Sequence, residues 1–155
     1  MLLKAEIYKE IDKKVESDDF LKSAEEVSYI ASGQIKDTQI KNLQNIINST
    51  TRFGEIINFV KSQTGRHQKG DNNWVKLGPA LLDELYKIDG YAKEIAEDCI
   101  KKIAEDYAKK NAGKKPEEKK EPEKYDPDEL KGQIRLELCR HWIKIVLADF
   151  LYNKR

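Results

Sequence analysis

The sequence predicts an all-α protein, a single-domain bundle of about five to six helices. Apolar residues recur at three- and four-residue spacing along most of the chain, and no segment alternates apolar and polar residues as a half-buried strand would. Eight glycines and four prolines in 155 residues are also too few for the turns of a many-stranded sheet. A chain of this length is expected to bury one core as one domain, residues 1–155.

The first elements are two short helices. Residues 3–15 carry apolar side chains four apart, which places those side chains on one side of a helix. Ser17 then offers an N-cap for a second helix over residues 20–31. Asp18 and Asp19 favour a helix start because carboxylates suit the positive end of the helix dipole.

The next element is predicted to be one long helix over residues 38–64 with two distinct faces. Its apolar residues keep the spacing of one helix side and are Ile40, Leu43, Ile46, Ile47, Ile57 and Val60. The opposite side carries two amides and two cations at steps of four, three and four residues, namely Lys41, Asn45, Asn48 and Arg52. Gly65 is well placed to end this helix.

Two further helices are expected before a linker. The first covers residues 74–88 with Pro79 near its first turn, and Gly90 separates it from a second over residues 91–110. Residues 111–125 then lack bulky aliphatic side chains before Tyr125, so burial cannot offset the entropy cost of ordering them. We expect a mobile Lys/Glu/Pro-rich linker there, whose default role is solubility or tethering.

The last helix is predicted over residues 127–152. Asp126 can cap it, Pro127 suits its first position, and Glu129 can complete a capping box. Its apolar residues nearly encircle the axis and leave one thin polar strip, which consists of Gln133, Glu137, Arg140 and Lys144. A helix that is apolar nearly all round belongs at the centre of a fold or in an interface.

Composition limits the class of partner. The formal net charge is +1, so a nucleic-acid surface would have to be a local patch. No window approaches the roughly 20 apolar residues that span a bilayer, and we expect no membrane partner. Two cysteines are too few for a disulfide framework, which favours a reducing, cytoplasmic setting.

The sequence has few residues in the patterns typical of enzymes, and we expect no catalytic site, metal site or cofactor. The two histidines lack partners at metal-ligand spacing, and no glycine-rich phosphate loop is present. An enzyme that uses Cys139 with His141 is the alternative, since the fold could bring a nucleophile and a base together. A buried structural cysteine is the favoured reading.

The mixed face of the long helix is the best functional clue, because cations and amides together meet phosphates and hydroxyls. Basic residues continue beyond it, so the candidate RNA-binding residues are Lys41, Asn45, Asn48, Arg52, Lys61, Arg66, Lys69 and Lys76. A solvated helix face is the plain alternative. Phe59 and Trp74 could stack on bases or belong to the core. Arg140 and Lys144 are read as surface salt-bridge partners of Glu137.

Three segments of the chain resemble the small helical (Csm-type) subunit of type III-A CRISPR interference complexes. They are TQIKNLQNIIN at 38–48, WVKLGPALLDELYKIDG at 74–90 and LCRHWIKIVLADFLYNKR at 138–155. They are similar to the family's Gln-Ile helix start, its Leu/Tyr-rich middle helix and its aromatic closing helix. The chain has Lys41 where the family has arginine, ends the middle segment in IDG where a basic end is usual, and carries 111–125 as an apparent insertion. A small subunit of another type III lineage is an alternative.

The resemblance implies a non-catalytic protein that contacts guide RNA and target RNA. It also implies assembly with other copies of itself and with the backbone and large subunits of an effector complex, which hold the catalytic activities. A helical scaffold or dimerisation protein without nucleic-acid binding is the main alternative. A helix-turn-helix DNA reader, with Gly90 in the turn, is weaker because the following helix starts with acidic residues.

Overall fold

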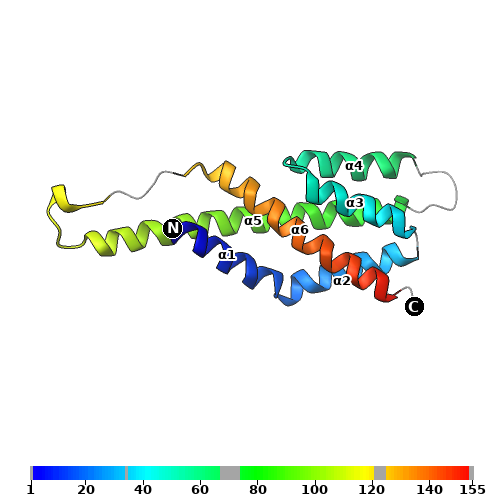
Figure 1. Ribbon diagram of the computed structural model, residues 1–155, viewed down its shortest axis with the longest axis horizontal. Helices are drawn as coiled ribbons and strands as arrows, with labels where there is room; N and C mark the ends of the chain where they lie inside the picture. Colours follow the sequence, from blue (N-terminus) through cyan, green and yellow to red (C-terminus); the bar gives the residue numbers. More distant parts are fainter. Residues whose placement is uncertain (1, 34, 67–73, 121–124, 154–155) are drawn as a thin grey trace.

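The computed structural model describes residues 2–33, 35–66, 74–120 and 125–153. These residues form six α-helices and one short 3₁₀ helix, and none of them is in a strand. In chain order the elements are α1 (Leu2–Val15), α2 (Asp18–Ser32), α3 (Asp37–Ser49), α4 (Phe53–Arg66), α5 (Trp74–Asn111), η1 (Pro116–Glu118) and α6 (Pro127–Asn153). Figure 1 shows an elongated bundle with α5 along its long axis. The predicted all-α bundle is confirmed.

Helix α6 is the centre of the bundle, as its sequence predicts. It packs against each of α1 to α5. Its buried residues cover most of its circumference and are Leu130, Ile134, Leu136, Leu138, Cys139, Trp142, Ile143, Val146 and Phe150. The indole Nε1 of Trp142 donates a hydrogen bond to Ser23 Oγ on α2 at 3.1 Å, which satisfies the one polar atom of a fully buried ring. The backbone N of Asp128 donates to Asp126 Oδ1 at 3.0 Å, so the predicted cap is confirmed.

The prediction of one continuous helix over residues 38–64 is wrong. Helix α3 ends at Ser49 and α4 begins at Phe53, and the intervening Thr50 is extended, with φ −79° and ψ 151°. The hydroxyl Oγ1 of Thr50 accepts a hydrogen bond from the backbone N of Arg52 at 3.0 Å. Hydroxyl side chains that bond the local backbone in this way compete with helix continuation.

A change of phase in the apolar pattern accompanies this break. The buried residues of α3 are Ile40, Leu43 and Ile47, and those of α4 are Phe53, Ile56, Ile57 and Val60. At about 100° per residue, the second set is displaced by roughly a third of a turn from the first. Two helices can each bury their own stripe, whereas one straight helix would leave part of the pattern in solvent.

The prediction of separate helices on either side of Gly90 is also wrong, because α5 continues unbroken from Trp74 to Asn111. Gly90 is exposed within it, and nothing lies within 4 Å of where its Cβ would be. One glycine costs a helix only about 1 kcal/mol, which packing of the flanking turns offsets. Pro79 lies in the second turn of α5 rather than the first. Ser17 precedes α2, but its hydroxyl donates to the Lys14 carbonyl and does not cap that helix.

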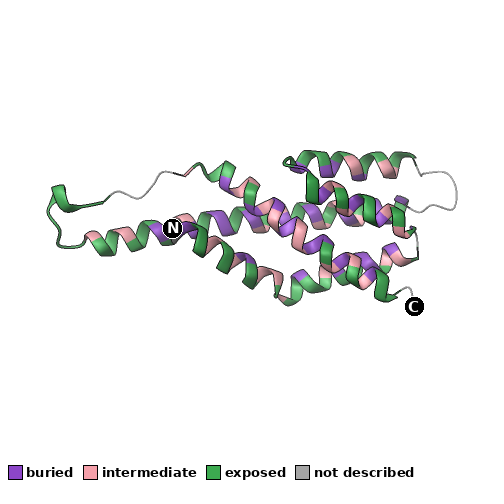
Figure 2. Cartoon of the chain, in the orientation of Figure 1, coloured by how far each residue is buried: buried purple, intermediate pink, exposed green. Residues whose placement is uncertain are grey.

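The segment predicted as a linker projects beyond the end of the bundle (Figure 1). Residues 112–120 are exposed throughout, as Figure 2 also shows. Two hydrogen bonds nevertheless close this segment into a loop, from Asn111 Nδ2 to the Lys120 carbonyl at 2.6 Å and from Lys120 N to Asn111 Oδ1 at 3.1 Å. Gly113 takes the left-handed conformation, with φ +79°. The two hydrogen bonds therefore give the loop a local structure. The mobility that we expect of this linker stays a prediction. Residues 121–124 of the linker lie outside the described part of the chain.

Candidate nucleic-acid interface

Helix α3 has the two faces that its sequence predicts. Ile40, Leu43 and Ile47 are completely buried against the bundle, whereas Lys41, Asn45 and Asn48 are exposed. Gln44 lies between these polar residues on the same helical stripe and is partly exposed. The division of α3 into an apolar and a polar face is confirmed, while contact of the polar face with RNA stays a prediction.

Arg52 does not continue this polar stripe as a helical residue. It is exposed in the connection between α3 and α4, beyond the end of α3. Its backbone N is held by the Thr50 hydroxyl, and its side chain is free to extend from the end of α3 into solvent. Arg52 therefore adds charge next to the stripe, but not at the predicted helical register.

The remaining predicted cations lie elsewhere. Lys61 and Arg66 are exposed on α4, and Lys76 is exposed in the first turn of α5. Lys69 lies outside the described residues. None of Lys61, Arg66 and Lys76 lines the groove described next, so the structure does not bring all the predicted cations together on one surface.

A groove of about 330 Å³ lies between α3 and α6, which pack against each other. Its lining residues are all polar and are Gln44, Asn48, Glu137, Arg140, His141 and Lys144. Two of them come from the polar stripe of α3, and four come from the polar strip of α6 and its immediate neighbours. Lining residues with polar side chains, two of them cations, suit a charged, hydrogen-bonding ligand better than an apolar one.

Arg140 holds a fixed position in this groove. Its Nη1 atom forms an ion pair with Glu137 Oε1 at 2.9 Å, which confirms the predicted salt bridge. Its Nη2 atom donates a hydrogen bond to the backbone carbonyl of Thr50 at 3.2 Å. Glu137, the one carboxylate among the described lining residues, is thus partly neutralised.

Lys144 does not form the ion pair with Glu137 that its sequence position predicts. Its side chain is exposed and forms no ion pair with another described residue, so the expected pairing with Glu137 is made by Arg140 alone. An ammonium group without a carboxylate partner keeps its charge available for a ligand. With Lys41 about one helical turn from Gln44 on α3, the cations around the groove outnumber the single lining carboxylate.

No protein-family model, no curated protein and no solved structure matches this chain. The groove is therefore interpreted from its own residues. Of these residues the sequence predicts only Asn48 as RNA-binding, so five are not predicted, namely Gln44, Glu137, Arg140, His141 and Lys144. The polar strip of α6 is visible in the sequence, but no sequence signal shows that α3 packs beside it.

The aromatic residues near the predicted cations belong to the core. Trp74 is completely buried, and Phe59 is partly buried. Their ring centroids are 6.4 Å apart and the rings meet nearly edge to face, at 84°, a favourable packing geometry. Trp74 is therefore not available to stack on a base.

The environment of the two cysteines gives little support to the alternative of a catalytic cysteine. Cys99 and Cys139 are free and buried, and burial raises the pKa of Cys99 to about 11 and that of Cys139 to about 12. The reactive form of cysteine is the thiolate, which is scarce at neutral pH for both residues. Among the described residues, no group of three or more His, Cys, Asp and Glu side chains is arranged to hold a metal ion. None of the described helices combines the length and apolar content needed to cross a bilayer.

Proposed function

We propose that this protein is a non-catalytic, RNA-contacting subunit of a ribonucleoprotein. The observation that carries the proposal is the groove between α3 and α6 that polar residues line, with Arg140 and Lys144 on one wall and Asn48 on the other. Lysine and arginine neutralise phosphates, and amide side chains bond phosphate and sugar oxygens. The exposed Lys41 and Asn45 extend the same surface along α3.

We further propose that the ribonucleoprotein is a type III CRISPR RNA-guided interference complex. The support is that two of the three segments with the family resemblance, 38–48 and 138–155, supply most of the groove. Gln44 and Asn48 come from the first segment, and Arg140, His141 and Lys144 from the second. In this proposal the partners are guide RNA, target RNA, the backbone and large subunits, and further copies of the chain. Two free buried thiols suit the reducing cytoplasm.

Charge reversal on both walls of the groove tests the RNA contact. Lys41→Glu combined with Lys144→Glu should weaken binding of the full-length protein to RNA at least tenfold at moderate salt, measured by fluorescence anisotropy. Lys101→Glu is the matched control, because Lys101 is exposed on α5 away from the groove. Equal RNA affinity for the double variant and the control would contradict the proposal.

A helical scaffold that assembles without nucleic acid is the second candidate, and exposed rings on α2 and α6 favour it. Tyr29 and Tyr152 are 76% and 78% exposed, and they lie on helices that pack against each other. Exposed large rings are common in protein interfaces. This candidate predicts a dimer whose association is insensitive to salt and which has no affinity for RNA, measured by analytical ultracentrifugation and anisotropy.

A further inference from the structure

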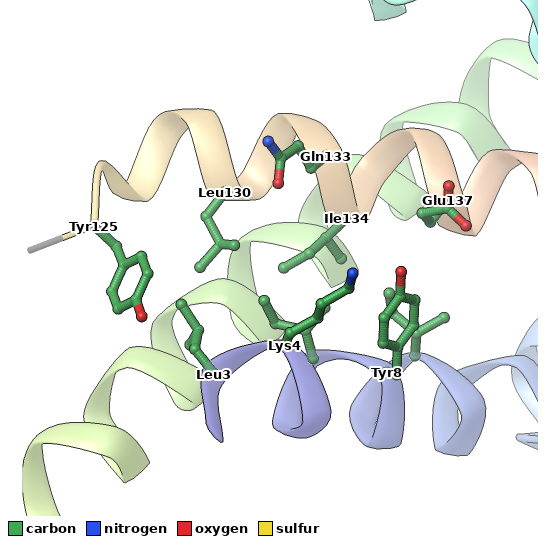
Figure 3. Close-up of a pocket in the computed structure, with 10 residues that line it drawn as sticks. Leu3, Lys4, Tyr8, Tyr125, Leu130, Gln133, Ile134 and Glu137 are labelled. Atoms are coloured by element: carbon green, nitrogen blue, oxygen red, sulfur yellow. The ribbon is translucent and has the colours of Figure 1, made fainter. Parts of the chain in front are cut away.

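A second hollow lies between α6 and α1, farther toward the N-terminus of α6 than the groove. It has a volume of about 370 Å³ and is lined mainly by aliphatic side chains of the two helices, together with two aromatic rings, Tyr8 and Tyr125. Figure 3 shows Tyr8 rising from α1 toward α6, with the amine of Lys4 beside it and Glu137 above it. Apolar walls with a few polar groups at the rim are typical of small-ligand cavities of this size.

This cavity adjoins the groove between α3 and α6 along α6. A third hollow lies beside both and shares Tyr8 and Gln133 with the cavity and Arg140 with the groove. Glu137 lines all three. The three hollows therefore adjoin one another along α6, and together they are called the channel here; one end is apolar and aromatic and the other is cationic.

We propose that this channel binds single-stranded nucleic acid, with phosphates at Arg140 and Lys144 and one unstacked base in the cavity against Tyr8. The inference rests on the proposed function and adds the class of RNA that the site takes. A duplex hides the faces of its bases, whereas a single strand can turn a base out to stack on an aromatic side chain. A groove that served duplex RNA alone would need no apolar, aromatic extension.

The surroundings of Tyr8 support a base and its phosphate. Tyr8 is 50% exposed, so part of its side chain is accessible to a ligand. The Nζ atom of Lys4 lies 5.9 Å from the ring centroid, close enough for a phosphate next to the stacked base to meet it. Gln133 and Glu137 at the rim offer hydrogen-bonding groups to the edge of a base.

The carboxylate of Glu137 should weaken the binding of nucleic acid to the channel. It lies where the cavity meets the groove and forms an ion pair with Arg140. A bound phosphate would be repelled by this carboxylate and would compete with it for the guanidinium group. Removing its charge by Glu137→Gln should therefore strengthen the binding of nucleic acid, whereas it should weaken the binding of a basic peptide.

The test compares a fluorescently labelled oligouridylate with a blunt RNA duplex of the same length, each bound to the full-length protein. Tyr8→Leu should weaken binding of the single strand roughly fivefold or more and leave the duplex unchanged, since stacking on aromatic rings contributes on this scale. Tyr8→Phe keeps the ring and should retain single-strand affinity. Tyr86→Leu is the matched control, because Tyr86 is 52% exposed on α5 and lies outside the channel.

A cross-link localises the base independently of these affinities. Oligouridylate that contains 4-thiouridine should cross-link to the α1 peptide around Tyr8, and cross-links confined to α4 would overturn the proposal. A protein with an apolar anchor is the competing occupant of the channel. It predicts that neither Tyr8→Leu nor Glu137→Gln changes RNA affinity.

The same variants distinguish a wrong assignment of the base pocket at Tyr8 from a wrong assignment of the RNA contact. If Lys144→Gln weakens binding of single strand and duplex alike while Tyr8→Leu changes neither, the base pocket is overturned and the RNA contact stands. If the wild-type protein binds neither oligonucleotide, both are overturned. A preference for single strands that is lost in Tyr8→Leu and increased in Glu137→Gln supports both.

Discussion

The Nη2 atom of Arg140 on α6 donates a hydrogen bond to the backbone carbonyl of Thr50, where α3 ends, at 3.2 Å. Carbonyl groups at a helix C-terminus lack partners within the helix and carry partial negative charge. The Arg140 guanidinium satisfies one of them while Nη1 holds Glu137. This bond therefore links the end of α3 to α6 beside the groove.

Arg140→Lys should destabilise the fold by about 1 kcal/mol, because a single ammonium cannot reach both Thr50 and Glu137 as the guanidinium fork does. Urea unfolding measures the change. Lys144→Gln is the control, since Lys144 is exposed, and should stay within about 0.5 kcal/mol of wild type. Equal stability of Arg140→Lys and wild type would show that the bond to Thr50 does not hold α3 in place.

The ion-pair cluster around Asp89 should make stability depend on pH. Asp89 Oδ1 lies 2.7 Å from Arg135 Nη1 and 3.2 Å from Lys131 Nζ, which joins α5 to α6. Burial acts to raise the pKa of Asp89, but hydrogen bonds from Arg135 and Lys131 outweigh it and the pKa falls below its usual 3.8.

Because the folded pKa is the lower one, this stabilisation is complete above pH 3.8 and is lost as the pH falls through the folded value. Asp89→Asn should therefore be less stable than wild type at neutral pH by about 1–2 kcal/mol, and the difference should shrink in acid. Urea unfolding at a series of pH values measures it, with the exposed Asp98→Asn as control. A difference that does not change with pH would contradict the assignment.

Two glycines of α5 should respond oppositely to alanine. A methyl group at Gly78 would overlap the Thr64 side chain on α4, whereas at Gly90 nothing lies within 4 Å. Gly78→Ala should destabilise the protein by about 1–3 kcal/mol through overpacking, and Gly90→Ala should stabilise it by up to about 1 kcal/mol. Adding Thr64→Ala to Gly78→Ala should recover most of the loss in thermal unfolding. A stabilising Gly78→Ala would mean that α4 and α5 are less closely packed.

Both cysteines should resist alkylation in the native protein. Burial raises the pKa of Cys99 to about 11 and that of Cys139 to about 12, so the thiolate is scarce and screened from reagent. Iodoacetamide at mildly alkaline pH should label them only after unfolding, as mapped by mass spectrometry. Rapid labelling of native Cys139 would instead revive the enzyme hypothesis.

Much of the fold could be predicted from local pattern. The cap at Asp126 and the apolar residues all round α6 are local signals, and they predict both its bounds and its central position. The three-and-four spacing of apolar residues does not predict the break at Thr50. The apolar stripe moves to another side of the helix between Ile47 and Phe53, and spacing alone does not show this change. The predicted helix boundary at Gly90 is wrong because one exposed glycine does not end a helix whose residues on both sides are packed in the bundle.

The candidate site could be predicted only in part. The polar stripe of α3 depends on helical periodicity, which sequence carries, and Lys41 and Asn48 are exposed as predicted. The partner wall of the groove depends on which helix packs beside α3, a contact between residues far apart in the chain. The sequence does not place Arg140 in a site, because its position in the groove depends on the packing of α6 beside α3.

The salt dependence of RNA binding tests the central claim most directly, that phosphates bind between α3 and α6. For single-stranded nucleic acid, the logarithm of the association constant falls with the logarithm of salt concentration by about 0.7 for each phosphate contact. The double variant Lys41→Gln, Lys144→Gln should therefore lower the slope by about 1.4, whereas Lys101→Gln should leave it unchanged. An unchanged slope in the double variant, or no binding by the wild-type protein, would contradict the account.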